Sequence, residues 1–143
     1  MTTDDLSGGP LDNATLEVMG RRATSHPLVV RWRFRPDGMA PRVLELQLDT
    51  GQYPDDVNET RLDVRWFEDG SYTVHYLEVR GNDVWQCRWD RHSKPEAPMA
   101  HFHPPPDAGV DIEPSMLEVS HPLDVLFAVL TWIEERISRL FED

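Results

Sequence analysis

The sequence predicts an α+β fold in which a mainly antiparallel sheet of about five strands packs on a long C-terminal helix. Apolar and polar residues alternate in several stretches between positions 28 and 89, and apolar residues recur at helical spacing from about 120 to 142. At 143 residues the chain is long enough to form one domain, 1–143, around a single hydrophobic core. A short N-terminal helix completes the expected architecture.

The N-terminal third contains the expected short helix and the first two strands. Residues 1–9 show no apolar period, and we expect them to be disordered. From Pro10, apolar residues at helical spacing predict a short helix to about Arg22. The stretches 28–35 and 43–48 alternate apolar and polar residues, which predicts two strands.

Three further strands are predicted at 61–67, 71–79 and 84–89, joined by tight turns at Gly70 and Gly81. A two-residue turn at Gly70 mixes apolar and polar residues on one face. A three-residue turn with Gly70 in the left-handed conformation instead pairs Trp66 with Tyr72 and gathers most large apolar residues on one face. We predict the second register.

In this register the opposite face carries two rows of polar residues across three neighbouring strands. The first row is Asp63, His75 and Arg88, and the second is Arg65, Thr73 and Asp90. These rows are compatible with a solvated face on which opposite charges pair across strands. They are also compatible with a functional site, because the chain continues from Asp90 into a segment rich in histidine.

That segment, 93–119, has no apolar period and is predicted to form an ordered loop rich in Pro and His. Three consecutive prolines, 104–106, are expected to form a stiff polyproline strut. The C-terminal helix is predicted over 120–142, with Ser120 as its N-cap. Its apolar face, which includes Trp132, is wider than a surface helix requires, so the helix is either covered on two sides or contacts a partner.

His101 and His103 form the sharpest local pattern in the chain. In an extended segment, both imidazoles point to one side and Phe102 points to the other. Two such histidines can act as general acid and base in phosphodiester cleavage. They can instead bind a divalent metal with a third ligand such as His92, Asp90 or Asp107, or lie in the loop without a chemical role.

Arginine supplies the candidate anion-binding groups. Arg88, Arg91 and His75 are placed to bind a phosphate beside the two histidines, since a guanidinium group can hold a phosphate with two hydrogen bonds. The alternative is that these arginines only form ion pairs with Asp63 or Asp90. Cys87 is predicted on the apolar face and is most simply a buried small side chain.

The charge balance is strongly acidic, with 26 Asp and Glu against 14 Lys and Arg and a formal net charge of -12. Such a surface suits a cytoplasm of very high salt, where repulsion is screened within about 3 Å at 1 M, and suggests a halophilic source. Acidity argues against a nucleic-acid partner, but in a halophilic protein local Arg clusters remain informative. The single cysteine excludes an internal disulfide, and no apolar run is long enough to span a membrane, so we expect a cytoplasmic protein.

Several motifs follow one another in the second half of the chain. They are YTVHY (Tyr72–Tyr76), RWD (Arg88–Asp90), HFHPP (His101–Pro105), Pro114-Ser115 and a helix from Ser120. In this order they resemble the TumE-like toxin family of prokaryotic toxin–antitoxin systems, also described as a family of unknown function. The resemblance covers about residues 72–140. The family pattern Asn-x-Pro-His after the Asp is replaced here by Arg91-His92-Ser93-Lys94, so only His92 can stand in for that histidine.

The resemblance implies a type II toxin that acts as a metal-independent endoribonuclease, without a cofactor, and a small DNA-binding antitoxin as its partner. The residues expected to carry catalysis are His101, His103, His75, Arg88 and Asp90. Those expected to bind the RNA substrate are Arg65, Arg91 and His92. The alternatives are a metal site at His92, His101 and His103, and a diverged, inactive member that binds a partner through the apolar C-terminal helix. The oligomeric state, including a homo-oligomer, is left open.

Overall fold

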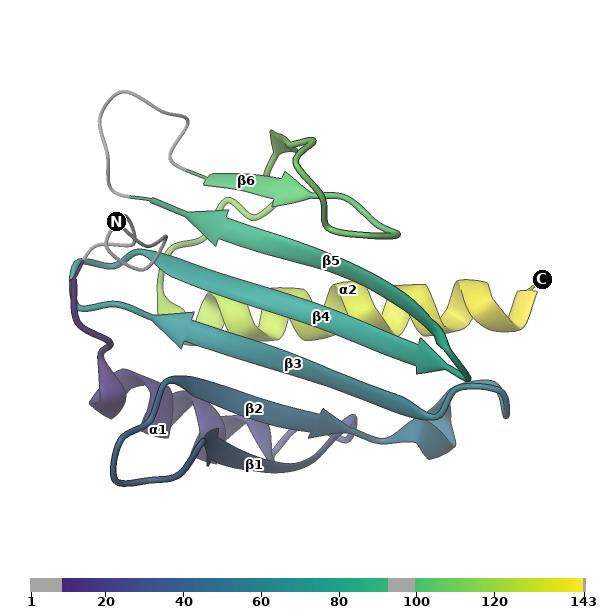
Figure 1. The fold of residues 1–143 in the computed structure, drawn as a ribbon, viewed down its shortest axis with the longest axis horizontal. Helices are drawn as coiled ribbons and strands as arrows, with labels where there is room; N and C mark the ends of the chain where they lie inside the picture. Colours follow the sequence, from purple (N-terminus) through teal and green to yellow (C-terminus); the bar gives the residue numbers. More distant parts are fainter. Residues whose placement is uncertain (1–8, 93–99, 143) are drawn as a thin grey trace.

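The computed structural model describes residues 9–92 and 100–142, which form one antiparallel sheet and two α-helices (Figure 1). The elements in chain order are α1 (Asn13–Ala23), β1 (Val29–Arg35), β2 (Val43–Leu48), the short 3-10 helix η2 (Thr50–Gln52), β3 (Glu59–Trp66), β4 (Tyr72–Arg80), β5 (Asp83–Arg91), β6 (Ala100–His103), β7 (Glu113–Pro114) and α2 (Pro122–Glu142). Each strand is hydrogen-bonded to its neighbour in the sequence, in the order β1 to β7. The predicted α+β class is therefore confirmed.

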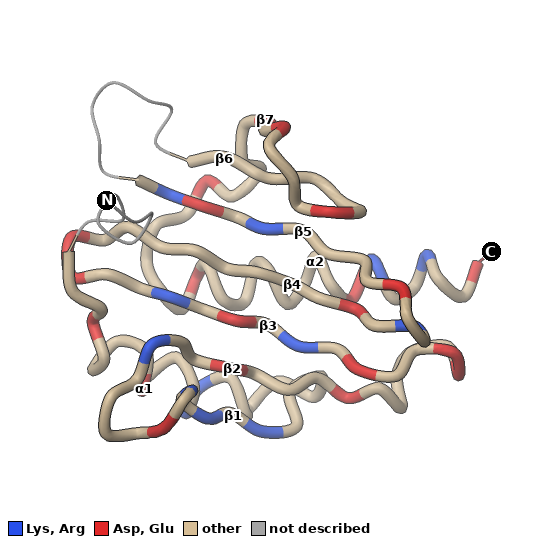
Figure 2. Tube along the Cα trace, viewed as in Figure 1, with Lys and Arg blue, Asp and Glu red and all other residues tan. Residues whose placement is uncertain are grey.

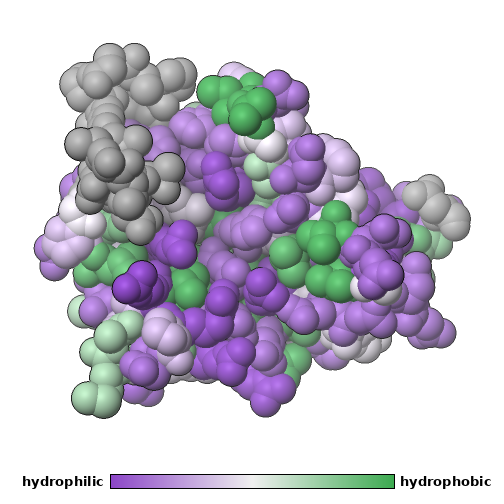
Figure 3. All heavy atoms as spheres, in the orientation of Figure 1, coloured by the Kyte–Doolittle hydropathy of each residue, from purple (hydrophilic) through white to green (hydrophobic). Residues whose placement is uncertain are grey.

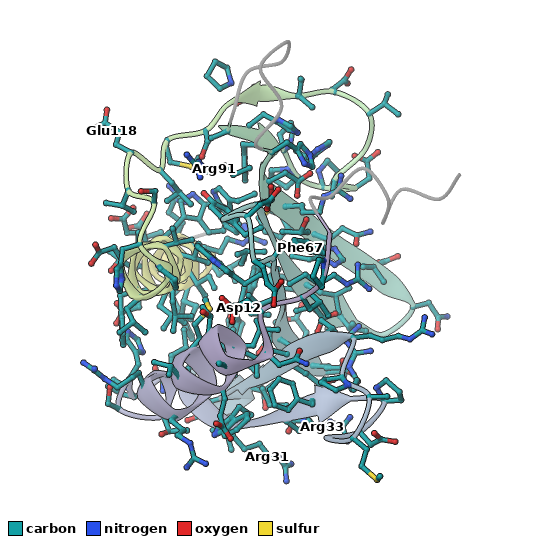
Figure 4. All side chains as sticks on the ribbon, turned by 90° about the vertical axis from the view of Figure 1, so that its left-hand side faces the viewer. Asp12, Arg31, Arg33, Phe67, Arg91 and Glu118 are labelled. Carbon is teal, nitrogen blue, oxygen red and sulfur yellow. The ribbon has the colours of Figure 1, made fainter. Side chains whose placement is uncertain are left out.

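Both α-helices cover the same face of the sheet, which gives the protein two layers (Figures 1 and 4). The hydrophobic core lies between these layers, and Trp89, Tyr72 and Tyr76 are among its largest fully buried side chains. Within the described residues, the other face of the sheet carries no helix. This second face, called the open face below, holds the polar rows predicted from the sequence.

The predicted register of the central hairpins is confirmed. Trp66 pairs with Tyr72 and Val64 pairs with Val74, around a turn in which Gly70 has a φ of 88°. That backbone conformation is open to glycine because it has no Cβ. The next hairpin continues the same register, with Cys87 opposite Tyr76. Burial confirms Cys87 as a core side chain, and desolvation raises the pKa of its thiol.

The described part of the chain contains seven strands, rather than the five expected. The two additional strands, β6 and β7, lie in the segment predicted to be a loop, and β6 pairs with β5. Phe102 is the reason that so polar a segment forms a strand. Its ring is buried against Trp89, with ring centroids 5.1 Å apart, while its neighbours point to the open face.

The N-terminal helix begins at Asn13, three residues later than the predicted start at Pro10. Asp12 caps it, because its side chain accepts a hydrogen bond from the Thr15 N–H. The preceding residues pair with the end of β3 instead, with a bridge between Leu11 and Phe67 (Figure 4). The helix then packs closely on β1, and a Cβ added at Gly20 would come within 2.5 Å of the Trp32 ring.

The C-terminal helix begins at Pro122, and its cap is His121 rather than the predicted Ser120. Nδ1 of His121 accepts a hydrogen bond from the Leu123 N–H at 3.2 Å, while Pro122 has no N–H to satisfy. The wide apolar face of the helix is used within the chain. Trp132 contacts Tyr76, Trp85, Trp89 and Phe102, so the central part of this face packs against the chain's own core.

A buried ion pair links the helix to the sheet. Glu78 on β4 is fully buried, and Arg136 on α2 donates two hydrogen bonds to its carboxylate, at 2.9 and 3.0 Å. The Tyr76 hydroxyl donates a third, at 2.6 Å. Arg136 also lies over the Trp85 ring, 3.6 Å from the centroid. This network fixes α2 on the sheet.

Two expectations concern residues outside the described part of the chain. The disorder predicted for 1–9 concerns mainly residues 1–8, and the first part of the predicted Pro- and His-rich loop comprises 93–99. Among the described residues, no helix is both long and apolar enough to cross a membrane.

Candidate functional site

The predicted polar rows form on the open face and extend further than the sequence indicated. Asp63 pairs with His75 and His75 pairs with Arg88, as predicted. The pairing continues on both sides, so that one row crosses six strands from β1 to β6. Its members are Arg33, Glu45, Asp63, His75, Arg88 and His103. Figure 2 shows basic positions on β1, an acidic position on β2, and positions of both charges on β3 and β5.

The second predicted row also continues onto β6. Arg65 pairs with Thr73, Thr73 with Asp90, and Asp90 with His101. Both histidines of the His-x-His motif therefore stand on the open face beside the residues predicted to act with them. This placement follows from the strand geometry of β6, in which alternate side chains point to the same side.

Arg88, Asp90 and His103 form a compact cluster at the junction of the two rows. Nε of Arg88 donates to both carboxylate oxygens of Asp90, at 3.1 and 3.0 Å. Nε2 of His103 lies 3.0 Å from Oδ2 of Asp90 and 3.0 Å from Nη2 of Arg88. Asp90 and His103 are buried, whereas the Arg88 side chain is 36% exposed. The guanidinium group is thus the part of the cluster that an incoming anion meets first.

The turn after β6 fixes the orientation of His103. The Asp107 carboxylate accepts a hydrogen bond from the Gly109 N–H, and Ala108 adopts a left-handed φ of 50°. This conformation brings the Gly109 carbonyl within 2.7 Å of Nδ1 of His103. A carbonyl only accepts hydrogen bonds, so the proton of the neutral imidazole lies on Nδ1.

The three prolines of this turn do not form the predicted polyproline strut. The Ala108 N–H donates to the Pro104 carbonyl at 3.2 Å, and the Gln86 N–H donates to the Pro106 carbonyl at 2.9 Å. The prolines therefore bend the chain back against β5. The bend is what carries Gly109 to His103.

The position of the Nδ1 proton determines what Nε2 can do. When the imidazole is neutral, Nε2 is an acceptor and Arg88 can donate to it. When the imidazole is charged, Nε2 is a donor and the Asp90 carboxylate can accept from it. The cluster therefore offers a partner to both protonation states of His103, as a proton-transferring group requires.

His101 and His92 adjoin this cluster. Nε2 of His101 lies 3.7 Å from Oδ2 of Asp90, and the rings of His101 and His103 are 5.2 Å apart between centroids. The His92 ring lies on the other side of His101, 5.3 Å away. Nδ1 of His92 is buried and has no hydrogen-bond partner among the described residues.

A metal set different from the predicted one could be drawn from these residues. Donor atoms of Asp90, His101 and His103 all lie within 4.8 Å of one another, and His92 is not a member of this set. The Arg88 guanidinium, however, is in hydrogen-bond contact with two of the three. A divalent cation would have to displace this positive group, so the cluster fits an anion better than a metal.

His75 contributes hydrogen bonding rather than charge. Desolvation lowers its pKa from the ordinary value of 6.5, although the Gln86 side chain, 2.7 Å from Nε2, and the Asp63 charge oppose this shift. The imidazole is therefore neutral at neutral pH. It lies beside Arg88 but adds no positive charge to an anion site.

The predicted substrate-binding arginines occupy different faces. Arg65 is exposed on the open face, where its Nε donates to the Arg42 carbonyl at 3.2 Å. Arg91 follows Asp90 directly and therefore points to the helix side of the sheet, where it lies near the Gly70 carbonyl (Figure 4). Arg91 does not join the cluster.

Two groups of the site were not foreseen. Gln86 orients His75, and the Gly109 carbonyl orients His103. The alternation of β5 places Gln86 next to Arg88 on the open face, so a sequence signal for Gln86 existed. The contact between His103 and the Gly109 carbonyl depends on the backbone turn at 104–109. The sequence signal for this turn was Gly109 itself.

Comparison with models of known protein families finds a match. A family model described as Toxin TumE matches residues 19–137, which is most of the chain. The match includes the end of α1 and the first three strands, for which the sequence motifs gave no resemblance. Searches of curated proteins and of solved structures find no significant match.

Proposed function

The chain belongs to the TumE toxin family, and on this premise we infer that it is the toxic partner of an antitoxin and a metal-independent endoribonuclease. The observation that carries the proposal is the pair of contacts at Nε2 of His103. Arg88 can donate to this nitrogen in its neutral state, and Asp90 can accept from it in its charged state, each at 3.0 Å. General acid–base catalysis uses such a group.

The reaction we propose is transesterification within the RNA chain. His103 removes the proton of a ribose 2′-hydroxyl, whose oxygen then forms a bond to the adjacent phosphorus. Asp90 stabilises the imidazolium that results. The bond from phosphorus to the 5′-oxygen breaks, and His101 gives a proton to that oxygen. The products are a 2′,3′-cyclic phosphate and a 5′-hydroxyl end.

Arg88 stabilises the negative charge on the phosphate. Its Nε and Nη2 hold Asp90 and His103, which leaves Nη1 on a partly exposed side chain for the substrate. A guanidinium group aimed at the developing charge lowers the barrier because it is already oriented before the reaction. His75, which is neutral, supplies a hydrogen bond beside it.

Membership in a toxin family implies an antitoxin, and we expect this partner to be a small DNA-binding protein. The alternative of an inactive member that binds its partner through α2 has less support. The residues that this binding would need, Trp132 above all, pack within the chain's own core.

The test is cleavage of defined RNA by the purified protein at high salt. The His101→Gln and His103→Gln variants should each lose most of the activity, by about 10²-fold or more. His121→Asn, which alters an exposed histidine on the helix side and keeps a side-chain acceptor at the cap of α2, serves as the matched control. Product ends are identified by mass spectrometry, and an oligonucleotide with a single 2′-deoxy residue at the cut site should resist cleavage.

Two results would overturn the proposed nuclease activity, and a third would overturn the proposed reaction. One is the absence of cleavage of any RNA by the wild-type protein. The other is equal cleavage by the wild type and both site variants, which would point to a contaminating nuclease. Cleavage that yields a 3′-hydroxyl and a 5′-phosphate would also contradict this chemistry.

A further inference from the structure

The open face presents arginine to the solvent and keeps most of its acidic groups recessed, with the exception of Glu59 at the start of β3, whose side chain is 52% exposed. The Arg33 side chain is 61% exposed, and that of Arg88 is 36% exposed, whereas Glu45 and Asp90 are only 5% and 6% exposed. Arg31 and Arg65 are also exposed. Away from Glu59, an approaching molecule therefore meets guanidinium groups before it meets carboxylates.

This local charge is opposite to that of the whole protein. Six arginines stand on the open face, in strands β1, β3 and β5. They are Arg31, Arg33, Arg35, Arg61, Arg65 and Arg88. The acids of the same strands and β2 that share the face are fewer: Glu45, Glu59, Asp63 and Asp90. A basic surface on a chain of net charge -12 indicates an anionic ligand.

The recessed acids orient these arginines. Arg35 contacts Glu45 at 2.7 Å and Asp63 at 2.8 Å, and Arg33 contacts Glu45 at 3.0 Å. Desolvation raises the pKa of Glu45, but the hydrogen bonds and charges of its neighbours outweigh this effect and lower it. The carboxylate is therefore ionised and holds both guanidinium groups in place. A guanidinium group held in this way loses little side-chain conformational freedom when it binds a phosphate.

A groove runs along β1, β2 and the start of β3 on this face. Its volume is about 630 Å³, and its lining includes Arg31, Arg33, Arg35, Arg61, Glu45 and Gln47. Figure 3 shows that hydrophilic side chains cover most of the open face, with apolar patches toward its ends. The row from Arg33 to His103 connects this groove with the histidine cluster.

We propose that the groove and the arginines beside it bind the sugar–phosphate backbone of single-stranded RNA, which crosses the strands from β1 to the histidines of β6. The inference rests on the proposed function, because it describes where the RNA substrate of that same site lies on the protein. Five strand spacings of about 4.8 Å make this path roughly 24 Å long, enough for several nucleotides. Contacts to phosphates of this kind carry no sequence information.

A single strand fits this surface better than a duplex. His103 and Asp90 are recessed between the strands of the sheet. A flexible strand can bring one phosphodiester into contact with recessed side chains, whereas a duplex holds its phosphates on a rigid cylinder. The strand also remains free to turn its bases away from the protein.

The test measures binding without cleavage. Fluorescence anisotropy follows a labelled 2′-O-methyl RNA oligonucleotide, which has no free 2′-hydroxyl and cannot be cut by the proposed chemistry. Arg31→Gln/Arg33→Gln is compared with Arg21→Gln/Arg22→Gln, which removes the same two charges from α1 on the other side of the sheet. Losing two phosphate contacts should reduce the slope of log K against log salt by about 1.4 and weaken binding at every salt concentration.

The controls separate the ligand classes. A duplex of the same sequence should bind more weakly than the single strand, and poly-L-glutamate should not compete with it at equal charge. The inference is overturned if the two double variants bind alike, if the duplex binds more tightly, or if polyglutamate displaces the oligonucleotide. The last result would identify an acidic protein segment as the ligand.

The outcome is also distinct from that of the cleavage test. RNA binding that depends on Arg31 and Arg33, without cleavage of ordinary RNA, would support the proposed RNA-binding surface and reject the proposed nuclease activity. If Arg31→Gln/Arg33→Gln changes neither the KM nor the kcat of RNA cleavage, the nuclease activity is supported and the proposed RNA-binding surface is rejected.

Discussion

Nε2 of His103 lies 3.0 Å from Oδ2 of Asp90, while Nδ1 of the same ring lies 2.7 Å from the Gly109 carbonyl. Nε2 therefore has an acceptor in Asp90 and a donor in Arg88, both within hydrogen-bond distance. Which of these two contacts Nε2 makes depends on where Arg88 points. A phosphate that attracts Arg88 would act directly on the group that we propose as the base.

Replacing Asp90 by Asn should reduce RNA cleavage while leaving the shape of the site intact. The amide cannot stabilise the imidazolium of His103, so we expect kcat to fall by about 10²-fold, with a smaller change in KM. Single-turnover cleavage measures the effect. Asp63→Asn makes the same substitution on β3, in the neighbouring row, and should retain kcat. Equal rates for both variants would exclude Asp90 from the reaction.

The neutral form of His103 should carry its proton on Nδ1. The Gly109 carbonyl requires this tautomer, and Asp107 holds the turn that presents the carbonyl. Long-range ¹H–¹⁵N NMR of the imidazole distinguishes the tautomers. Asp107→Ala should mix the two, and Asp107→Asn, which keeps the side-chain acceptor, should restore the wild-type spectrum. A wild-type signal for the Nε2–H tautomer would contradict the assigned geometry.

The sheet was predictable wherever alternation and turn chemistry agreed. Gly70 in a left-handed turn allows a single register that buries Trp66 together with Tyr72, and the polar row of Asp63, His75 and Arg88 follows from it. The same alternation, continued by one residue past Asp90, places Arg91 on the helix side. The separation of Arg91 from the cluster could therefore have been predicted from the sequence alone.

Other features needed tertiary structure. The β6 strand has only Phe102 as a buried apolar anchor and forms because the edge of β5 offers backbone hydrogen bonds. The first helix starts at the Asp12 cap because Leu11, the residue before it, pairs with Phe67. The second is capped by His121, whose Nδ1 accepts from the Leu123 N–H. The contact between His103 and Gly109 depends on a turn whose path no periodicity encodes.

His75 should make the fold less stable in mild acid. Burial lowers its folded pKa below the ordinary value of 6.5, so the unfolded chain binds more protons as the pH falls through that value. The stability that neutral His75 contributes is present above pH 6.5 and is lost as the pH falls toward the folded pKa. We expect the free energy of unfolding of His75→Gln to vary less between pH 7.5 and about 5 than that of the wild type. A steeper dependence in the variant would give the opposite sign and contradict the shift.

The buried pair of Glu78 and Arg136 should show strong coupling. Arg136→Met leaves the fully buried Glu78 carboxylate with the more distant Arg80, 3.7 Å away, as its cation and should cost about 3–5 kcal/mol of stability. Glu78→Gln/Arg136→Met removes both charges and should recover a large part of this loss. Urea unfolding of the two single variants and the double variant completes the cycle. Additive effects would mean that the pair contributes little to the attachment of α2.

Arg88 should keep divalent metal ions out of the histidine cluster. Its guanidinium group contacts Asp90 and His103, whose donor atoms otherwise lie within 4.8 Å of those of His101. Removing the positive charge in Arg88→Ala leaves a carboxylate and two imidazoles, a ligand set that suits Zn²⁺ or Co²⁺. We therefore expect the visible spectrum of Co²⁺ to change with Arg88→Ala and not with the wild type.

Arg65→Ala is the matched control for Arg88→Ala in the Co²⁺ experiment. It removes one positive charge from the same face, at an exposed residue that does not contact the histidine cluster. Chelation of metals should leave RNA cleavage by the wild-type protein unchanged, since no step of the proposed reaction uses a cation. Tight Co²⁺ binding by the wild type, together with loss of cleavage in EDTA, would instead make Asp90, His101 and His103 metal ligands. The arginine would then have to leave the cluster before the reaction, and the roles assigned to both histidines would be wrong.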